Sequence, residues 1–379
     1  MRRVLVVVHR WIGLSSAAVL VVLGTTGSIL ALAPRVDAWT HPSLHRVERR
    51  ATHVDAQRLL DSARTRLGPA PVTAIDIGGP TESWVFHSDN RVVFVDPYTS
   101  VVIGVRTGPT AMDRLLNNAY RLHTQLGGLQ IGGIHAGRAL VDGATVAALS
   151  SLVSGCILWW KRKRFRFRRG AGWRIISWDL HSAVGIWGLA ALLMLATSGL
   201  FIAVPELLFA ITHSAPAPFV PTPLSDALGA DGTVRCTTGG AASPTLDDVL
   251  RAADRAVPDL ATTTITFPAG KRAPYRVTKR PDGGLGDLST FVMIDRYCGI
   301  VAAVDRSMST SRGFRIYSWN LAIHDGNAWS DAGRFFICAC SLLLGVSSLT
   351  GVLMWVARAR PFSRFRVPSL THSSLRDPP

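Results

Sequence analysis

Four runs of apolar residues in this chain are each long enough to cross a lipid bilayer. A helix needs about 20 apolar residues to span a hydrocarbon core of about 30 Å. The runs are Val4–Ala33, Leu140–Trp160, Ile175–Val204 and Phe335–Ala357. The first begins directly after Met1-Arg2-Arg3 and no clear small-residue cleavage site follows it, so it predicts a retained span rather than a secretory signal. The sequence therefore predicts a membrane α-helical bundle of four spans.

The net charge of +16 is concentrated at the ends of these runs. Basic residues precede the first run, fill 161–169 between the second and third, and follow the fourth from Arg358 onward. With four spans, all three clusters lie on one side of the membrane, and the positive-inside rule makes that side cytoplasmic. Both termini are then cytoplasmic, and segments 34–139 and 205–334 lie outside. This placement favours contact with the lipid bilayer and argues against nucleic-acid binding.

Both outer segments are predicted to be small α+β domains. Apolar residues recur at helical spacing in Asp55–Leu67 and Leu246–Val257. Runs rich in β-branched and aromatic residues follow each helix: Ser83–His87, Val92–Val95, Thr262–Phe267, Tyr275–Lys279 and Thr290–Ile294. Turn-forming dipeptides separate these runs.

The two halves of the chain repeat one another. His9-x3-Gly13-x11-Thr25-Thr26-Gly27 matches His181-x3-Gly185-x11-Thr197-Ser198-Gly199, and Gly137-Arg138 with Gly155 matches Gly333-Arg334 with Gly351. We therefore predict a tandem duplication, with a pseudo-twofold axis along the membrane normal. The predicted segments are spans 4–33, 135–161, 175–205 and 331–358, periplasmic domains 34–134 and 206–330, a basic cytoplasmic loop 162–174 and a cytoplasmic tail 359–379.

His9 and His181 are equivalent under this repeat, and both lie at the cytoplasmic mouth of a span. Ionisable groups at such depth are costly and face the bundle interior. Two imidazoles on opposing helices suit axial ligation of a haem iron. Gly13 and Gly185, one turn further on, would leave room for the flat macrocycle. Gly27 and Gly199 lie five turns from the histidines, and hence are expected on the same face.

A second centre is expected near the outer face. His324 precedes Gly333 in the second half, and its counterpart in the first half is either His123 or His135. An insertion in the glycine-rich stretch Gly127–Gly133 would make His123 the equivalent residue. The sequence thus predicts two haems, one near each face of the membrane.

Cysteine usage limits the kind of haem. Cys236 and Cys298 lie in the second outer segment, an oxidising compartment under this topology, where they could form a disulfide. The other three cysteines lie in spans. The sequence has no CxxCH motif, so covalent attachment is not indicated and haem b is expected.

These residues resemble a known family. His-Arg-Trp-x-Gly-Leu at 9–14, Thr26-Gly27, Asp179-Leu180-His181 and the Gly-x3-Trp that closes spans two and four are similar to PepSY-associated transmembrane proteins, also called iron-regulated membrane proteins of the ferric-siderophore reductase type. The resemblance covers about residues 4–358. It implies a bacterial inner-membrane haem protein that reduces Fe(III) in a periplasmic ferric-siderophore to Fe(II). The stretch between His123 and Gly137 is longer than is usual in the family.

Other functions are compatible with parts of the pattern. The sequence has no GxGxxG after a strand, so the electron donor is expected to be a quinol or a separate cytoplasmic reductase. PepSY domains elsewhere are linked to peptidase regulation, so the alternative is a membrane sensor or peptidase-regulating protein without redox activity. A parallel repeat also occurs in transporters, but acidic residues are missing from the middle of the spans.

Overall fold

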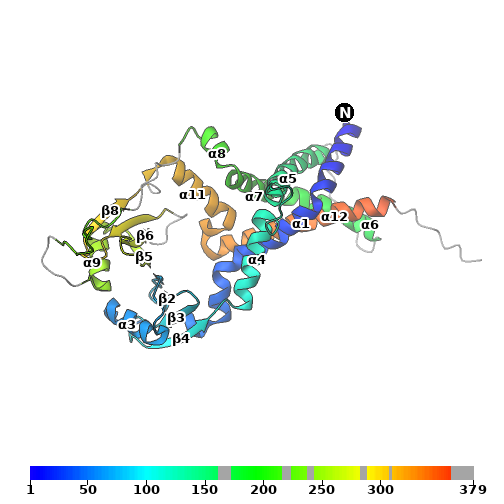
Figure 1. The fold of residues 1–379 in the computed structure, drawn as a ribbon. Coiled ribbons are helices and arrows are strands. Elements are labelled where there is room, and N and C mark those ends of the chain that lie inside the picture. The colour runs from blue at the N-terminus through cyan, green and yellow to red at the C-terminus, as the bar shows by residue number, and fades with distance from the viewer. Residues whose placement is uncertain (161–171, 216–222, 237–242, 282–287, 307–309, 360–379) are drawn as a thin grey trace, which may run out of the picture.

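The computed structural model describes residues 1–160, 172–215, 223–236, 243–281, 288–306 and 310–359, and Figure 1 shows their fold. A helical bundle lies at one end and a curved sheet with its helices at the other. Most of the predicted cytoplasmic loop 162–174 and of the predicted tail 359–379 falls outside the described residues.

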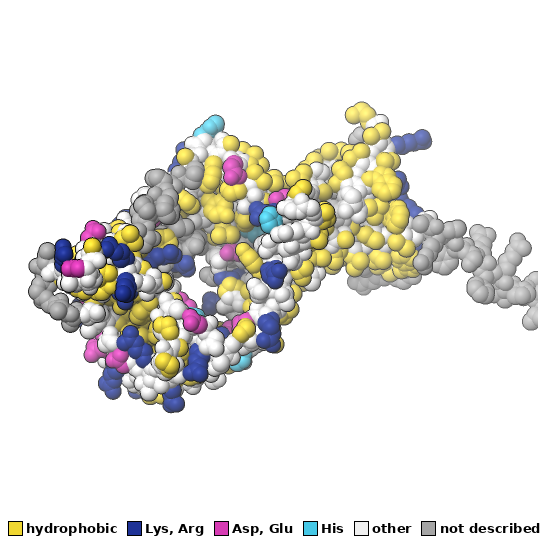
Figure 2. All heavy atoms as spheres, in the orientation of Figure 1, with side chains coloured by type: hydrophobic (Ala, Val, Ile, Leu, Met, Phe, Trp, Pro, Cys, Tyr) yellow, Lys and Arg dark blue, Asp and Glu magenta, His cyan; other side chains and the backbone are white. Residues whose placement is uncertain are grey.

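Within the described residues, three helices are long and apolar enough to cross a membrane. They are α1 (Arg2–Thr40), α5 (Ala136–Trp160) and α12 (Ser330–Ala359). Their large apolar side chains are exposed along much of their length, and hydrophobic side chains cover the bundle in Figure 2 while charged ones gather over the sheet. Lipid is the medium in which such a surface is stable, so this is a helical membrane protein that also carries a β-sheet.

The third apolar run differs from the single span predicted at 175–205. It forms α6 (Trp173–Trp187) and α7 (Leu189–Ala203), which are bent by 68° where they meet. Gly188 lies at the break with φ −82° and ψ −5°, and a Cβ there would lie 2.7 Å from the Val184 carbonyl oxygen. Glycine is therefore the residue that permits this close turn.

Among the described residues, eight strands form one antiparallel sheet in the order β4-β3-β2-β1-β5-β6-β7-β8. The strands are β1 (Ala74–Asp76), β2 (Trp84–His87), β3 (Arg91–Val95), β4 (Val102–Thr107), β5 (Ala261–Thr266), β6 (Tyr275–Arg280), β7 (Thr290–Ile294) and β8 (Val301–Asp305). β1 pairs with β5, with Ile75 opposite Ile265, so the two outer segments share a sheet. The strands β1, β4 and β8 were not predicted, because each is short or lies at an edge where burial does not impose a clear pattern.

Two helices cover one face of this sheet and close its core. They are α3 (Ala56–Leu67) and α9 (Leu246–Ala256), both close to their predicted bounds. Their apolar faces pack on alternate strand residues, and fully buried examples are Leu59, Ile75, Val249 and Ile265. Charged residues lie on the opposite faces of the helices, as expected for amphipathic helices at a surface.

Both halves have the same order of elements. After the fourth strand, each half has a helix that packs against the bundle: α4 (Ala111–Gln125) and α11 (Arg312–Asp325). Short helices α2 (Pro42–His45) and α8 (Pro205–Ile211) follow the first and third apolar runs. Asp96 and Asp295 each accept a backbone N–H from the tyrosine two residues on, at 2.8 Å in both cases.

The helices α3 and α9, which lie on the same face of the sheet, cap each other's first turns. The carboxylate of Asp247 accepts the backbone N–H groups of Ala56 and Gln57 at 2.9 Å, and the side-chain oxygen of Gln57 accepts the N–H of Leu246 at 2.9 Å. Asp55, the N-cap of α3, makes no side-chain cap of its own. The first turn of α3 therefore depends on the other half of the chain for its capping.

We expect Asp247→Ala to lower the free energy of unfolding by about 1 kcal/mol, the usual value of an N-terminal cap. Hydrogen exchange should accelerate at the amides of Ala56 and Gln57. Glu48→Ala is the matched control, because it removes an exposed carboxylate that lies 4.0 Å from the Arg50 guanidinium. Unchanged exchange in the Asp247 variant would show that solvent caps α3 equally well.

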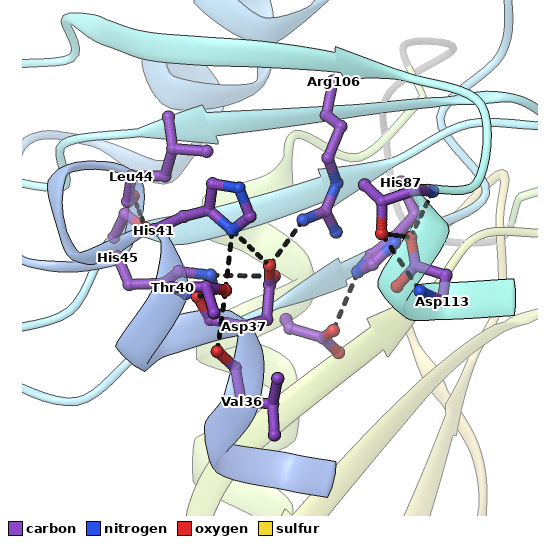
Figure 3. A network of polar contacts seen from close by, with 12 residues as sticks. Val36, Asp37, Thr40, His41, Leu44, His45, His87, Arg106 and Asp113 are labelled. Carbon is purple, nitrogen blue, oxygen red and sulfur yellow. Dashed lines mark hydrogen bonds and ion pairs between the residues drawn. The ribbon is translucent and has the colours of Figure 1, made fainter. Parts of the chain in front are cut away.

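A polar network fixes the outer end of α1 to the sheet (Figure 3). Asp37 accepts from Arg106 of β4 at 2.7 Å and lies 2.9 Å from the Nε2 atom of His45. These contacts fix the last turn of α1 to β4 and to the short helix α2.

Cys236 and Cys298 form a disulfide with Cα atoms 5.7 Å apart. Cys156, Cys338 and Cys340 are free and lie in α5 and α12. The disulfide confirms the pairing that the sequence allowed, and it fixes the segment before α9 to the turn between β7 and β8.

Candidate functional site

The structure brings His9 and His181 together at one end of the bundle. Their ring centres lie 6.3 Å apart and their ring planes are inclined by 76°. His9 lies in the third turn of α1, and His181 lies in the middle of α6. These two helices present equivalent residues of the predicted repeat to the same point, so His9 and His181 form an inner pair.

A second pair lies further along α1. His123 of α4 and His324 of α11 have ring centres 6.4 Å apart and ring planes inclined by 53°. The His123 ring lies beside Gly27 of α1, and the His324 ring lies beside Gly199 of α7. At a rise of about 1.5 Å per residue, Gly27 lies about 27 Å along α1 from His9. His123 and His324 therefore form an outer pair, separated from the inner pair by nearly the thickness of a bilayer core.

Each of the four histidines lies against a hydroxyl residue followed by glycine. The Nδ1 atoms of His9, His123 and His324 lie 2.9, 3.0 and 3.0 Å from the hydroxyl oxygens of Ser154, Thr26 and Ser198. That of His181 lies 3.2 Å from Thr350 Oγ1 and 2.9 Å from the carbonyl oxygen of Ser347. The residue that follows each hydroxyl residue in the chain is a glycine. A Cβ atom at this glycine would lie 3.1 to 3.5 Å from the Cε1 atom of the same histidine. The four glycines are Gly155, Gly27, Gly199 and Gly351.

These contacts fix which ring nitrogen carries the proton. The hydroxyls of Ser154, Thr26 and Thr350 each donate their proton to the carbonyl four residues earlier, at 2.7 to 2.8 Å, and Ser198 donates to Leu195 at 3.0 Å. A hydroxyl has one proton, so each can only accept from the histidine Nδ1–H. The lone pair of a neutral imidazole then resides on Nε2, which is the arrangement that metal-binding histidines use.

The donor set fits an iron porphyrin better than a bare metal ion. Within the described residues, no group of three or more His, Cys, Asp or Glu side chains could hold a metal ion. A structural zinc site needs four protein ligands, whereas a haem iron needs only axial ones.

The predicted glycines fall into two groups. A Cβ at Gly13 or Gly185 would meet no atom within 4 Å, so both positions beside the inner pair leave open space. Gly27 and Gly199 instead lie directly against the rings of His123 and His324. The sequence placed them on the same face as His9 and His181. Gly199 instead lies on α7, beyond the 68° bend that separates it from His181 of α6, and both glycines have an outer histidine as neighbour.

His135 lies apart from both pairs. It is exposed, precedes α5, and its Nδ1 atom lies 3.4 Å from the side-chain nitrogen of Gln130. The glycine-rich residues 127–133 form the connection between α4 and α5, as the predicted insertion would require. The structure therefore pairs His123, and not His135, with His324.

Burial keeps the outer pair neutral. Desolvation lowers the pKa of His123, and it lowers the pKa of His324 to about 4 with a further contribution from the charge of His123. Neither α4 nor α11 belongs to the helices that could span a membrane. At neutral pH both rings are therefore unprotonated at one nitrogen, which is the state that a metal requires.

The arrangement spans nearly the whole chain, and so does the family comparison. Residues 6–358 match the family described as the PepSY-associated TM region. The chain belongs to this family. A search of curated proteins finds no match. All four histidines of the two pairs lie within the part of the PepSY-associated region that the match covers.

Sequence reasoning missed the hydroxyl partners of the histidines. Ser154 and Thr350 were not singled out, although the signal was present, because each of the four apolar runs contains a Ser-Gly or Thr-Gly pair. Serine and threonine alone are common in membrane helices, where they donate to their own backbone. Only the histidine contacts distinguish these four.

Proposed function

We propose that this PepSY-associated protein is a haem-containing oxidoreductase of the bacterial inner membrane. It would carry electrons across the membrane and reduce a periplasmic ferric-siderophore, releasing the iron as Fe(II). The observation that carries the proposal is the presence of two histidine pairs at opposite ends of α1, each with ring centres 6.3 to 6.4 Å apart. Sensing or peptidase regulation requires no such pairs.

The proposal includes four spans, with α6 and α7 together forming the third and both termini cytoplasmic. It also includes the tandem duplication. Equivalent arginines support it: Arg138 donates to the carbonyl of Ala203 at 3.1 Å, and Arg334 to that of Ala31 at 3.4 Å. Each lies at the start of one apolar helix and contacts the end of another. Two halves that exchange the same contact are expected of a pseudo-twofold arrangement.

His9 and His181 would hold the inner haem b through their Nε2 atoms, and His123 and His324 the outer one. Haem b bound at each pair would supply a one-electron carrier. The four hydroxyls orient the rings and keep the proton on Nδ1, and the surrounding helices exclude water from both pairs. Fixed rings of this kind reduce the reorganisation that accompanies electron transfer.

The outer reaction adds one electron to a ferric complex. Fe(III) in the siderophore becomes Fe(II), and hard oxygen donors hold Fe(II) much less tightly. The electron would come from a quinol of the bilayer or from a cytoplasmic reductase at the inner pair. The outer pair lies on the side of the bundle that faces the sheet, so a substrate bound there is near the end of the pathway.

The absorption spectrum of the purified protein tests the proposal. We expect a Soret band, sharp α-bands on reduction, and two haems per chain. His9→Ala and His181→Ala should each lower the haem content from two to one, because a single remaining imidazole binds iron weakly. Oxidation of the dithionite-reduced protein by a ferric-siderophore, followed through the α-bands, tests the substrate. Colourless protein from haem-replete cells would instead support the sensor or peptidase-regulating alternative.

A further inference from the structure

Two buried polar atoms beside the inner pair have no hydrogen-bond partner among the described residues. They are the Nε atom of Arg10 and the hydroxyl oxygen of Ser151. A buried donor without an acceptor costs about 1–3 kcal/mol, and more when it is charged. Such groups persist where a ligand satisfies them.

Both residues lie within one helical turn, along their own helices, of His9 or of its hydroxyl partner Ser154. Arg10 follows it directly on α1, and its guanidinium lies over the Trp11 ring with the carbon atom 5.6 Å from the ring centre. Ser151 lies on α5, one turn before Ser154, whose hydroxyl contacts His9 at 2.9 Å. Ser150 and Ser154 donate to their own backbone, which is the usual arrangement for a helical serine, whereas Ser151 does not.

The charged residues near the inner pair are mostly cations, which favours the binding of an anion there. In the described inner ends of the bundle, from the mouths of the helices to the inner pair, Asp179 is the one carboxylate. The cations there are Arg2, Arg3, Arg10, Arg174 and Arg358. A partly buried guanidinium in a membrane helix is costly unless a negative charge lies nearby. Guanidinium and hydroxyl donors together suit a carboxylate, which accepts several hydrogen bonds at once.

We propose that Arg10 and Ser151 form a carboxylate subsite that receives a propionate group of the haem held by His9 and His181. The inference rests on the proposed function, because haem brings this carboxylate to the inner pair. The positive charge of Arg10 would also favour the reduced state, in which the iron porphyrin carries one more negative charge. Arg10 is then a positioning residue that sets the potential at which electrons enter.

Redox titration of Arg10→Gln tests the subsite. The protein is studied in nanodiscs of phosphatidylcholine, a lipid without net charge, and haem content is measured on the same samples. At the wild-type midpoint potential of the inner haem, we expect the ratio of reduced to oxidised haem to fall about tenfold, the effect of one unit charge at short range in a protein. The outer haem should keep its potential. Ser151→Ala should shift the inner potential in the same direction by less.

Arg3→Gln is the matched control, because it removes the same charge from an exposed residue of the same helix. Its titration should match the wild type. Arg10→Lys keeps the charge without the planar donors, and its potential should lie between those of the wild type and Arg10→Gln. It also provides a second test if the glutamine variant does not fold.

Three results would overturn the subsite. Arg10→Gln and Arg10→Lys could both hold two haems at wild-type potentials. Arg3→Gln could shift the potential as much as Arg10→Gln, which would indicate only general charge. An effect seen solely when phosphatidylglycerol is added would assign Arg10 to a lipid phosphate. Failure of the proposed function is distinguished from all three, because the wild-type protein would then show no haem spectrum at all.

Discussion

We expect the replacement of His123 with alanine to remove one of the two proposed haems, and the replacement of His135 to remove neither. The expected haem content is one per chain for His123→Ala and two for His135→Ala, measured by extraction of the haem against protein concentration. The reason is geometric. The ring centre of His123 lies 6.4 Å from that of His324, while His135 is exposed and contacts Gln130. Without His123, a haem at this site would have His324 as its one histidine ligand and would be held more weakly.

His324→Ala is the natural comparison for this pair. It should remove the same haem as His123→Ala, so the double variant should lose no more haem than either single variant. Residues that act on one site are strongly non-additive, and this distinguishes a shared ligand site from two separate ones. The opposite result would be retention of both haems by His123→Ala and loss of one haem by His135→Ala. It would assign the outer ligand to His135, and α5 would then have to begin at a different residue.

The inner pair could be predicted from the sequence because the two matching motifs are in register there. His9 and His181 have the same spacing to Gly13 and Gly185, and pseudo-symmetry brings equivalent residues together when their helices meet. The outer pair could not be settled in the same way. The connection 126–135 between α4 and α5 is longer than the one between α11 and α12, so counting from Gly137 leaves two histidines.

The helices that carry the outer histidines were also not predicted. α4 has a capping box at Thr110 and Asp113, which is a recognisable start signal, but its apolar residues are exposed or face the bundle rather than a domain core. Ala119 is its one residue that is classed as buried. The shared sheet was invisible for another reason. β1 is only three residues long, and its pairing with β5 joins segments that are far apart in the sequence.

The second large expected effect is a loss of stability when a side chain is added at Gly24. This glycine lies where α1 and α12 cross. A Cβ at Gly24 would lie 2.6 Å from the Ser341 carbonyl oxygen and 2.7 Å from the Gly345 nitrogen. Both are backbone atoms, so a side chain cannot be accommodated by rotating a neighbour. Small residues at such crossings allow helix backbones to approach closely in membranes.

Gly24→Ala should therefore destabilise the protein by about 1–3 kcal/mol, as overpacking does in a close-packed interior. Gly143→Ala is the control, since that glycine lies in α5 with no atom within 4 Å of an added Cβ. It should be neutral or stabilising by up to about 1 kcal/mol, because alanine favours helix more than glycine does. Opposite signs for the two variants, measured by thermal unfolding in one detergent, are the expected result.

The consequence of Gly24→Leu should extend to both histidine pairs. Gly27 lies one turn further along α1, where a Cβ would be 3.1 Å from both the His123 Cε1 atom and the Ser341 hydroxyl oxygen. Displacing α12 from α1 moves Ser341, which lies beside Gly27 at the outer pair. It also moves Ser347, Thr350 and Gly351 of α12, which contact His181 of the inner pair. We therefore expect loss of both proposed haems. Retention of the inner haem alone would mean that the α1–α12 crossing holds only the outer end of the bundle.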